Sequence, residues 1–273
     1  MRAGGVTTGG LLVLGLQACS FQPAPPLSPD ATPVADARGA GPDAGLDAAP
    51  PPACLGPQPQ RARLCLQFDD ALDDQIATDG SGRGLHAALT NIRRATRDAP
   101  AGTTSPAAAP EASGAIVVDD DPGLDLPDAF TLLAWAKHRT GPGNAGVAFG
   151  LISKPGQYEL RLGYNNRPTC QVATSAGVKV AIQNQTLAPD QWYLLACTYD
   201  GAQLCVHSNW AGGTVETCVA ATGPVVTGSP LALLAGTLGP PPTVFAGELD
   251  AIHVFEVALE RAALCQLAGR PSC

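Results

Sequence analysis

Residues 192–206 read WYLLACTYDGAQLCV and consist of two apolar runs separated by Asp200–Gly201. An Asp-Gly pair between such runs is a strong signal for a tight β-hairpin, because both residues tolerate the backbone conformation that the turn requires. The stretch therefore predicts two antiparallel strands, Trp192–Tyr199 and Leu204–Ser208. If the flanking sequence repeats this pattern, the fold is all-β.

The same pattern of short apolar runs continues in both directions, with Gly, Pro, Asn and Asp between the runs. Helical spacing of apolar residues occurs only in the tail, at Leu259–Leu267. Many short strands separated by turn residues are typical of an all-β fold with two packed sheets. The further strands that we expect are Leu64–Phe68, Ala115–Val118, Phe130–Lys137, Val147–Ser153, Tyr158–Leu162, Cys170–Thr174, Val178–Gln183, Thr214–Ala220, Leu231–Ala235 and Ile252–Phe255.

Several of these segments follow one another in a characteristic order. They are FDD at 68–70, FTLLAWAK at 130–137, YELRL at 158–162, the hairpin at 192–206 and FAGELDAIHVFEVAL at 245–259. In this order they resemble the laminin-G-like branch of the concanavalin A-like jelly rolls, over about residues 62–268. The resemblance implies an antiparallel jelly-roll sandwich of two sheets.

Nine cysteines are many for 273 residues, and neither a C-x-x-C motif nor a zinc-finger spacing of Cys and His occurs. Disulfides in an oxidising compartment explain these cysteines better than structural zinc does. A hairpin turn centred on residues 211–212 would place Cys205 opposite Cys218, at a separation that a disulfide can bridge. The other expected bridges join Cys170 with Cys197, and Cys54 or Cys65 with Cys265 or Cys273.

Residues 1–18 predict a signal peptide, because Arg2 precedes an apolar segment at 9–16 that is too short to cross a bilayer. The next residues, Leu16-Gln17-Ala18-Cys19, resemble the lipobox of bacterial lipoproteins, in which the cysteine is acylated and becomes the mature N-terminus. A lipidated Cys19 also leaves an even number of cysteines to pair. By the same resemblance, Ser20 in place of Asp favours the outer membrane. We therefore expect a lipid-anchored protein of the cell envelope, and an ordinary signal peptide is the alternative.

The segment 19–60 differs in composition from the rest of the chain. From Phe21 to about Gln60 it consists almost entirely of Pro, Ala, Gly and Asp, without apolar periodicity. Such a segment buries too little surface to offset its ordering entropy, so it predicts a disordered tether. The folded domain is expected at 61–273.

The formal net charge of −8 argues against nucleic-acid binding, which requires clustered basic residues. The group that comes nearest to such a cluster consists of Arg93, Arg94 and Arg97. They lie in a polar stretch beside Asp98, so we interpret them as part of a solvated loop.

Glu248-Leu249-Asp250 is the segment that most resembles a catalytic motif, because related glucanases use E-x-D-x-E or E-x-D-x-x-E on one strand. The third acidic residue would act as the general acid, and its position holds Ile252 or, with a bulge, His253. The four histidines also lack the sequence context of known nucleophile triads. We therefore predict no catalytic residues.

Calcium is the one cofactor that the resemblance implies, since members of this family often hold one ion at the sandwich rim through Asp or Asn side chains and backbone carbonyls, which are suitable ligands for a hard cation. The candidate ligands are Asp119, Asp120, Asp121 and Asp125, with Asp69, Asp70, Asp73, Asp74 and Asp79 as a second group and solvated acidic loops as the alternative. Rim residues that could stack on a sugar or hydrogen-bond to it are Trp210, Tyr164, Asn165 and Asn166.

These features favour a surface-displayed, non-catalytic recognition or adhesion module. Its expected partners are the membrane, through the N-terminal lipid, and a glycan or an envelope or extracellular protein. Two alternatives stay open at this point, an envelope polysaccharide hydrolase with an unrecognised site and a structural envelope lipoprotein.

Overall fold

The strands of the protein account for nearly all of its regular structure, as the sequence predicts. The computed structural model describes residues 58–69, 75–98, 104–139, 148–210, 213–238 and 243–268. The strands are β1 (Ala62–Leu66), β2 (Ile76–Ala77), β3 (Ala87–Asp98), β4 (Thr104–Val118), β5 (Phe130–His138), β6 (Phe149–Lys154), β7 (Tyr158–Gly163), β8 (Arg167–Thr174), β9 (Gly177–Ile182), β10 (Tyr193–Tyr199), β11 (Gln203–Trp210), β12 (Gly213–Ala220), β13 (Leu233–Ala235), β14 (Thr237–Leu238), β15 (Thr243–Val244) and β16 (Gly247–Phe255). The helical elements are η1 (Pro59–Arg61), η4 (Pro122–Leu124), η5 (Tyr164–Asn166) and α1 (Arg261–Leu267).

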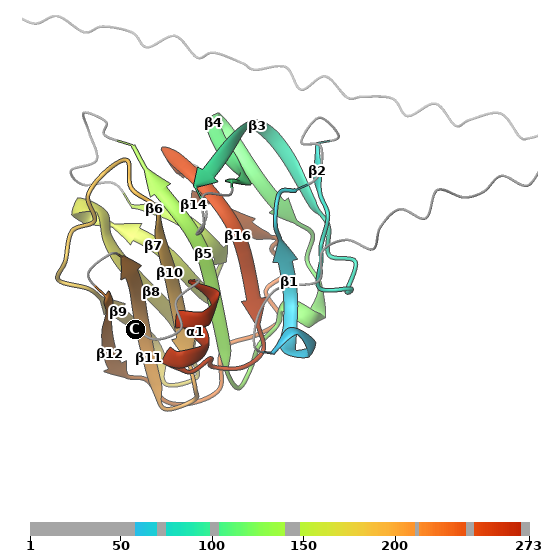
Figure 1. Cartoon of the computed structure of the whole chain (residues 1–273). Coiled ribbons are helices and arrows are strands. Elements are labelled where there is room, and N and C mark those ends of the chain that lie inside the picture. Colours follow the sequence, from blue (N-terminus) through green and yellow to red (C-terminus); the bar gives the residue numbers. More distant parts are fainter. Residues whose placement is uncertain are drawn as a thin grey trace, which may run out of the picture. The chain divides into compact units, whose positions relative to one another are not determined.

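The strands form two layers that face each other (Figure 1). Layer A has the hydrogen-bonded order β12-β11-β10-β5-β16, with β1 beside the second half of β16. Layer B has the order β13-β6-β7-β8-β9. Neighbouring strands in both layers are antiparallel. This arrangement confirms the predicted antiparallel sandwich.

Strand β4 connects the two layers because it is long enough to belong to both. In its first half Ala108 pairs with Leu249 of layer A, and in its second half residues 116–118 pair with residues 233–235 of layer B. Strand β3 follows β4 along almost its whole length. The β3–β4 ribbon therefore closes one side of the sandwich.

The core lies between the layers and is crossed by a disulfide. In β7, Tyr158, Leu160 and Leu162 point into the core while the residues between them point outward, as the two-residue period of a strand requires. Cys170 of β8 is bonded to Cys197 of β10, with the two Cα atoms 5.4 Å apart and both side chains fully buried. This bond covalently joins layer B to layer A.

A second disulfide joins two neighbouring strands within layer A. Cys205 of β11 lies directly opposite Cys218 of β12 and is bonded to it. Both of these bonds join the cysteines that the sequence analysis paired. Cys65 and Cys265 are also disulfide-bonded, whereas Cys54 and Cys273 lie outside the described residues.

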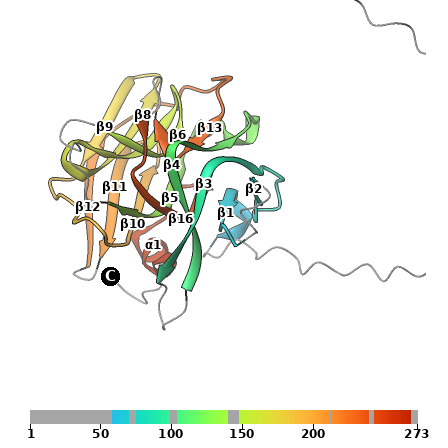
Figure 2. The same ribbon diagram turned by 90° about the horizontal axis from the view of Figure 1, so that it is seen from above.

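Part of the outer face of layer A is covered by α1 (Figure 2). Leu264 of this helix belongs to a small apolar cluster with Leu133, Leu194 and Phe255. This covering explains why every residue of β10 is buried, although a strand normally buries one face. Within the described residues, no helix has the length and apolar character needed to span a membrane.

The prediction that Arg93, Arg94 and Arg97 lie in a solvated loop is wrong, because these residues belong to β3. Arg97 is only 9% exposed, and its Nε donates a hydrogen bond to the fully buried Asp250 Oδ2 at 2.6 Å. Its guanidinium also lies 4.5 Å from the centroid of the Trp135 ring. Arg97 is therefore a structural residue that joins the ribbon to layer A.

Replacing Arg97 with Met should lower the free energy of unfolding by about 3–5 kcal/mol, because it leaves the Asp250 carboxylate buried without its partner. Urea unfolding measures this loss. The matched control is Arg93→Met, since Arg93 forms an exposed pair with Glu111 that should contribute less than about 1 kcal/mol. Equal, small losses in the two variants would contradict a structural role for the buried pair.

Candidate functional site

A row of polar side chains crosses the outer face of layer B. Ser153 of β6 lies opposite Glu159 of β7, Glu159 lies opposite Gln171 of β8, and Gln171 lies opposite Val180 of β9. Directly opposed residues in a sheet point to the same face. Because the alternate residues of β7 fill the core, this row must face outward.

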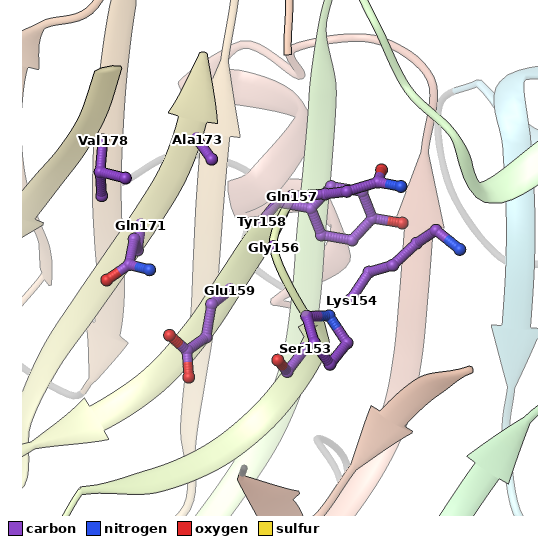
Figure 3. A pocket seen from close by; sticks show the side chains of 10 residues that line it. Ser153, Lys154, Gly156, Gln157, Tyr158, Glu159, Gln171, Ala173 and Val178 are labelled. Atoms are coloured by element: carbon purple, nitrogen blue, oxygen red, sulfur yellow. The ribbon is translucent and has the colours of Figure 1, made fainter. Parts of the chain in front are cut away.

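The row borders a pocket of about 300 Å³ (Figure 3). Figure 3 shows the polar ends of Ser153, Glu159 and Gln171 near one another, while Lys154 extends away from Glu159. The lining residues are Ser153, Lys154, Pro155, Gly156, Gln157, Tyr158, Glu159, Gln171, Ala173 and Val178. The turn between β6 and β7 closes one end of the pocket, and Gly156 in this turn has a φ of 83°, which favours glycine.

Glu159 is the carboxylate of this pocket and is 6% exposed. Burial raises the pKa of the Glu159 carboxyl, and the neighbouring Arg161 partly offsets this effect. Arg161 Nη1 donates to Glu159 Oε2 at 2.7 Å. The other oxygen, Oε1, is buried without a hydrogen-bond partner among the described residues.

Two further buried polar atoms near Glu159 also lack partners in the described part of the chain. They are Gln157 Oε1, an acceptor, and Arg161 Nε, a donor. A buried polar atom without a hydrogen bond costs about 1–3 kcal/mol, so a ligand in the pocket that donates to Glu159 or Gln157 gains this energy on binding. Hydroxyl groups suit such a site because each one both donates and accepts.

The edge strand β9 adds apolar surface beside the polar row. Val178 is 59% exposed and Ile182 is 43% exposed, and both point to the same outer face as Val180. Polar groups next to exposed aliphatic side chains form a surface that can bind ligands with both polar and apolar groups. The site is not predictable from the sequence, since Ser153, Glu159 and Gln171 become neighbours only through the strand register.

The predicted ligand residues Tyr164, Asn165 and Asn166 lie elsewhere. They form η5, at the end of β7 opposite to the pocket, and Tyr164 is 64% exposed. The end of β9 lies beside η5, and Gln183, just after β9, donates a hydrogen bond to the carbonyl of Val206 in β11. The backbone of the last residues of β11, which include Trp210, therefore lies at this same end of the sandwich. The side chain of Trp210 lies outside the described part of the structure. Tyr164, Asn165 and Asn166 therefore do not line the pocket.

The predicted calcium ligands lie at the pocket end of the sandwich and contact protein groups. Asp120 Oδ1 accepts a hydrogen bond at 2.5 Å from the ammonium of Lys154, whose side chain is fully buried. Asp125 lies 3.7 Å from the same ammonium and accepts hydrogen bonds from Gln157 and from the backbone of Gly228. Lys154 thus supplies a positive charge to these carboxylates.

The remaining predicted calcium ligands do not gather with them. Asp121 accepts from the backbone of Gly123 and caps η4, and Asp119 is exposed. Of the described residues, no three Asp or Glu carboxylates lie close enough together to hold one ion. The geometry therefore gives the calcium prediction at Asp119, Asp120, Asp121 and Asp125 no support.

Of the second acidic group, Asp79 has a structural role and Asp69 is exposed. Asp79 is 3% exposed and accepts hydrogen bonds from the backbone of Cys65, Ser81 and Leu85. Asp70, Asp73 and Asp74 lie outside the described residues.

A second pocket, of about 250 Å³, lies beside η4 and includes Asp125, Asp128, Arg63 and Glu256. Glu256 forms ion pairs with both Arg61 and Arg63. Arg63, the one cation among the described residues that line this pocket, is thus already paired with Glu256, and the pocket on layer B is the better candidate.

The segment that resembles a catalytic motif lies on β16, in layer A. Glu248 forms ion pairs with Lys137 and Arg139, and Asp250 is paired with Arg97. Ile252 belongs to the core and His253 is 2% exposed. The position of the missing acid is therefore filled by buried, non-acidic side chains.

His253 is the histidine with the most perturbed environment. Its ring contacts the Phe255 ring, with the centroids 5.8 Å apart, and its Nε2 lies 3.5 Å from Gln67 Nε2. Burial lowers the pKa of His253 to about 4. The neutral ring therefore packs as part of the fold.

Residues 110–265 match a family model, Laminin_G_3, described as the concanavalin A-like lectin/glucanases superfamily. The fold is similar to domain 4 of AbnA, a GH43 extracellular arabinanase from Geobacillus stearothermophilus, solved with arabinotriose (TM-score 0.56, 20% identity, 76% of this chain and 98% of that chain).

It is also similar to the binding domain of Paraclostridial Mosquitocidal Protein 1 (TM-score 0.55, 13% identity, 77% of this chain and 52% of that chain). A third similar structure is the binding domain of botulinum neurotoxin serotype G (TM-score 0.55, 13% identity, 76% of this chain and 50% of that chain). The chain thus spans about half the length of these two toxin domains. No curated protein matches the chain in sequence.

Because His253 is buried, we predict that the free energy of unfolding of the protein decreases in acid. Between pH 6.5 and about 4 the unfolded chain binds a proton at this residue that the folded protein does not bind, so the free energy of unfolding falls as the pH falls. The full shift in pKa corresponds to about 3 kcal/mol. Urea unfolding at several pH values should show this loss in the wild type relative to a His253→Gln variant. Identical pH dependence in the two proteins would exclude His253 as its source.

Proposed function

Because this chain belongs to the concanavalin A-like lectin/glucanase superfamily, we propose that its sandwich is a non-catalytic module that binds neutral glycan through the pocket on layer B. The main observation behind this proposal is Glu159, which lines the pocket with one carboxylate oxygen buried and unpaired among the described residues. Binding requires a small rotation of the Glu159 side chain that turns this oxygen toward the pocket, where a sugar hydroxyl donates to it in a charge-assisted hydrogen bond.

The neighbouring groups extend this recognition. The Gln171 amide and the Ser153 hydroxyl border the same pocket and can both donate and accept. Val178, at the edge of the pocket, offers an aliphatic surface for the C–H groups of a sugar ring. The pocket thus combines a few directed polar groups with apolar contact, as small-ligand sites generally do.

Charge favours a neutral ligand over an acidic one. Arg161 is already paired with Glu159, so the polar row has little net charge. The formal net charge of the chain is −8, which disfavours the approach of a polyanion. Neutral oligosaccharides therefore suit the site better than sulfated or uronic-acid polymers.

The comparisons support glycan binding at a coarse level. The arabinanase domain, which the chain covers almost completely, was solved with arabinotriose. The two toxin domains are binding domains by name. The superfamily also includes glucanases, and a retaining or inverting glycosidase needs two carboxyl groups at the cleaved bond. Of the described residues that line the pocket, only Glu159 is acidic.

The experiment is a glycan array, followed by calorimetric titration of the best neutral oligosaccharide. Glu159→Gln should weaken binding about tenfold or more, because it removes the charged acceptor while keeping the side-chain shape. The matched control is Glu111→Gln, at an exposed carboxylate on β4, and it should bind as the wild type does. Thermal unfolding of both variants checks that the fold is retained.

Two outcomes would overturn the proposal. The first is glycan binding that Glu159→Gln leaves unchanged. The second is a lack of binding to any glycan together with polysaccharide cleavage that is lost in Glu248→Gln, which would establish the hydrolase alternative instead.

We also propose that a lipid on Cys19 holds this module at the cell envelope, on the basis of the apolar segment at 9–16 and the lipobox-like residues before Cys19. Cys19→Ala should move the protein from the membrane fraction to the soluble fraction in cell fractionation. Membrane association that persists in this variant would contradict lipid anchoring through Cys19.

A further inference from the structure

The outer face of the β11–β12 hairpin presents four metal-ligating side chains in a two-by-two array. Cys205 lies opposite Cys218, and His207 lies opposite Glu216. The two pairs are two residues apart on each strand, so all four side chains point to the same face. This face belongs to layer A and is separate from the pocket on layer B.

Three of the four residues place their donor atoms close together, and His207 reaches this group through Glu216. The Sγ atoms of Cys205 and Cys218 and a carboxylate oxygen of Glu216 all lie within 4.8 Å of one another. Glu216 Oε1 is 3.4 Å from Cys218 Sγ, and Glu216 Oε2 is 3.3 Å from His207 Nδ1. Glu216 therefore lies between the cysteine pair and the histidine.

His207 has an unsatisfied nitrogen that points to this group. The residue is 5% exposed, and its Nδ1 is buried without a hydrogen bond from any described group. Its Nε2 lies 3.0 Å from Thr198 Oγ1. In the neutral ring with the proton on Nε2, the lone pair of Nδ1 faces a carboxylate oxygen, and a cation between them would bind both.

We propose that the reduced hairpin is a binding site for a divalent transition metal of the Zn²⁺ type, with Cys205, Cys218, His207 and Glu216 as the ligands. In the oxidised protein both sulfurs are used in the disulfide. Two molecules of a thiol reductant cleave this bond, which yields two cysteine thiols and the disulfide of the reductant. The metal then displaces the two thiol protons and binds two thiolates, Nδ1 and one carboxylate oxygen.

The arrangement suits tetrahedral zinc chemistry. Zinc–sulfur bonds of about 2.3 Å in a tetrahedral site place two thiolates about 3.8 Å apart, which directly opposed strand residues can reach. The Thr198 hydroxyl would accept from Nε2–H and so orient the imidazole, which is the usual role of a second partner of a metal-bound histidine.

The position of the Cys205–Cys218 disulfide also permits its reduction without that of the Cys170–Cys197 disulfide. Cys218 and Glu216 are exposed on the hairpin, whereas Cys170 and Cys197 are fully buried in the core. A mild thiol should therefore open the hairpin bond and leave the bond between the layers intact. The resulting site would be present only under reducing conditions.

The test uses the whole chain with Co²⁺ as a spectroscopic probe and Zn²⁺ as the competitor. After mild reduction, alkylation and peptide mapping should find free thiols at Cys205 and Cys218 and none at Cys170 and Cys197. This reduced protein should bind one equivalent of Co²⁺ with thiolate-to-metal charge-transfer absorption, and Zn²⁺ should displace it. The oxidised protein should bind none.

Variants then test the ligand set. Glu216→Gln and His207→Gln should each weaken Co²⁺ binding about tenfold or more, and Glu111→Gln should not change it. The double variant with Cys205→Ser and Cys218→Ser has no thiolates in the hairpin, so it should keep the fold without binding metal. Absence of Co²⁺ binding by the selectively reduced protein, or binding that is insensitive to both Glu216→Gln and His207→Gln, would overturn the proposal. The glycan titration is independent of this result.

Discussion

The disulfide between Cys170 and Cys197 crosses the core and joins the two layers of the sandwich covalently. It fixes which faces of the two layers are buried against each other, and all functional surface must then lie on the outer faces or at the rims. The outer face of layer A is partly covered by α1 and by the contact of Arg97 with Asp250 and Trp135. Among the described residues, no helix lies over the polar row on layer B, and we propose this row as the glycan-binding surface.

Most of the other buried charges are used internally. Asp250 binds Arg97, and Lys154 binds Asp120. Each of these pairs brings an ionised group out of water only together with a partner, which keeps the cost of burial small. Glu159 differs, because its pair with Arg161 leaves one oxygen unsatisfied beside a pocket. In the proposed function, a ligand hydroxyl is the missing partner of this oxygen.

Much of the fold was predictable because its signals are local. The Asp-Gly turn and the alternation of apolar residues identify strands such as β10 and β11, and the position of the turn predicts that Cys205 faces Cys218. The first half of β4 was not predictable in this way. It contains Pro106, Pro110 and a run of alanines that resembles a loop, yet Ala107 and Ala109 form a strand surface against which Trp192 packs. Tertiary contact overrides local propensity there.

The candidate site was not predictable for a related reason. A single Glu in an alternating strand, such as Glu159, has the same pattern as any solvated residue. Its role depends on the register of β6, β7 and β8, which places Ser153 and Gln171 beside it, and register between strands is not encoded in any one segment. The prediction of Tyr164, Asn165 and Asn166 rests on side-chain type and a loop position at the rim, and these residues lie at the other end of β7.

The central claim is that the outer face of layer B is where this module recognises glycan. Its most direct test is a nuclear magnetic resonance titration of the isotope-labelled protein with a neutral oligosaccharide that it binds. We predict that the largest shifts of backbone and side-chain amide signals occur at Ser153, Glu159, Gln171 and their neighbours on β9. Shifts concentrated at Tyr164–Asn166 or beside η4, with layer B unchanged, would contradict the claim.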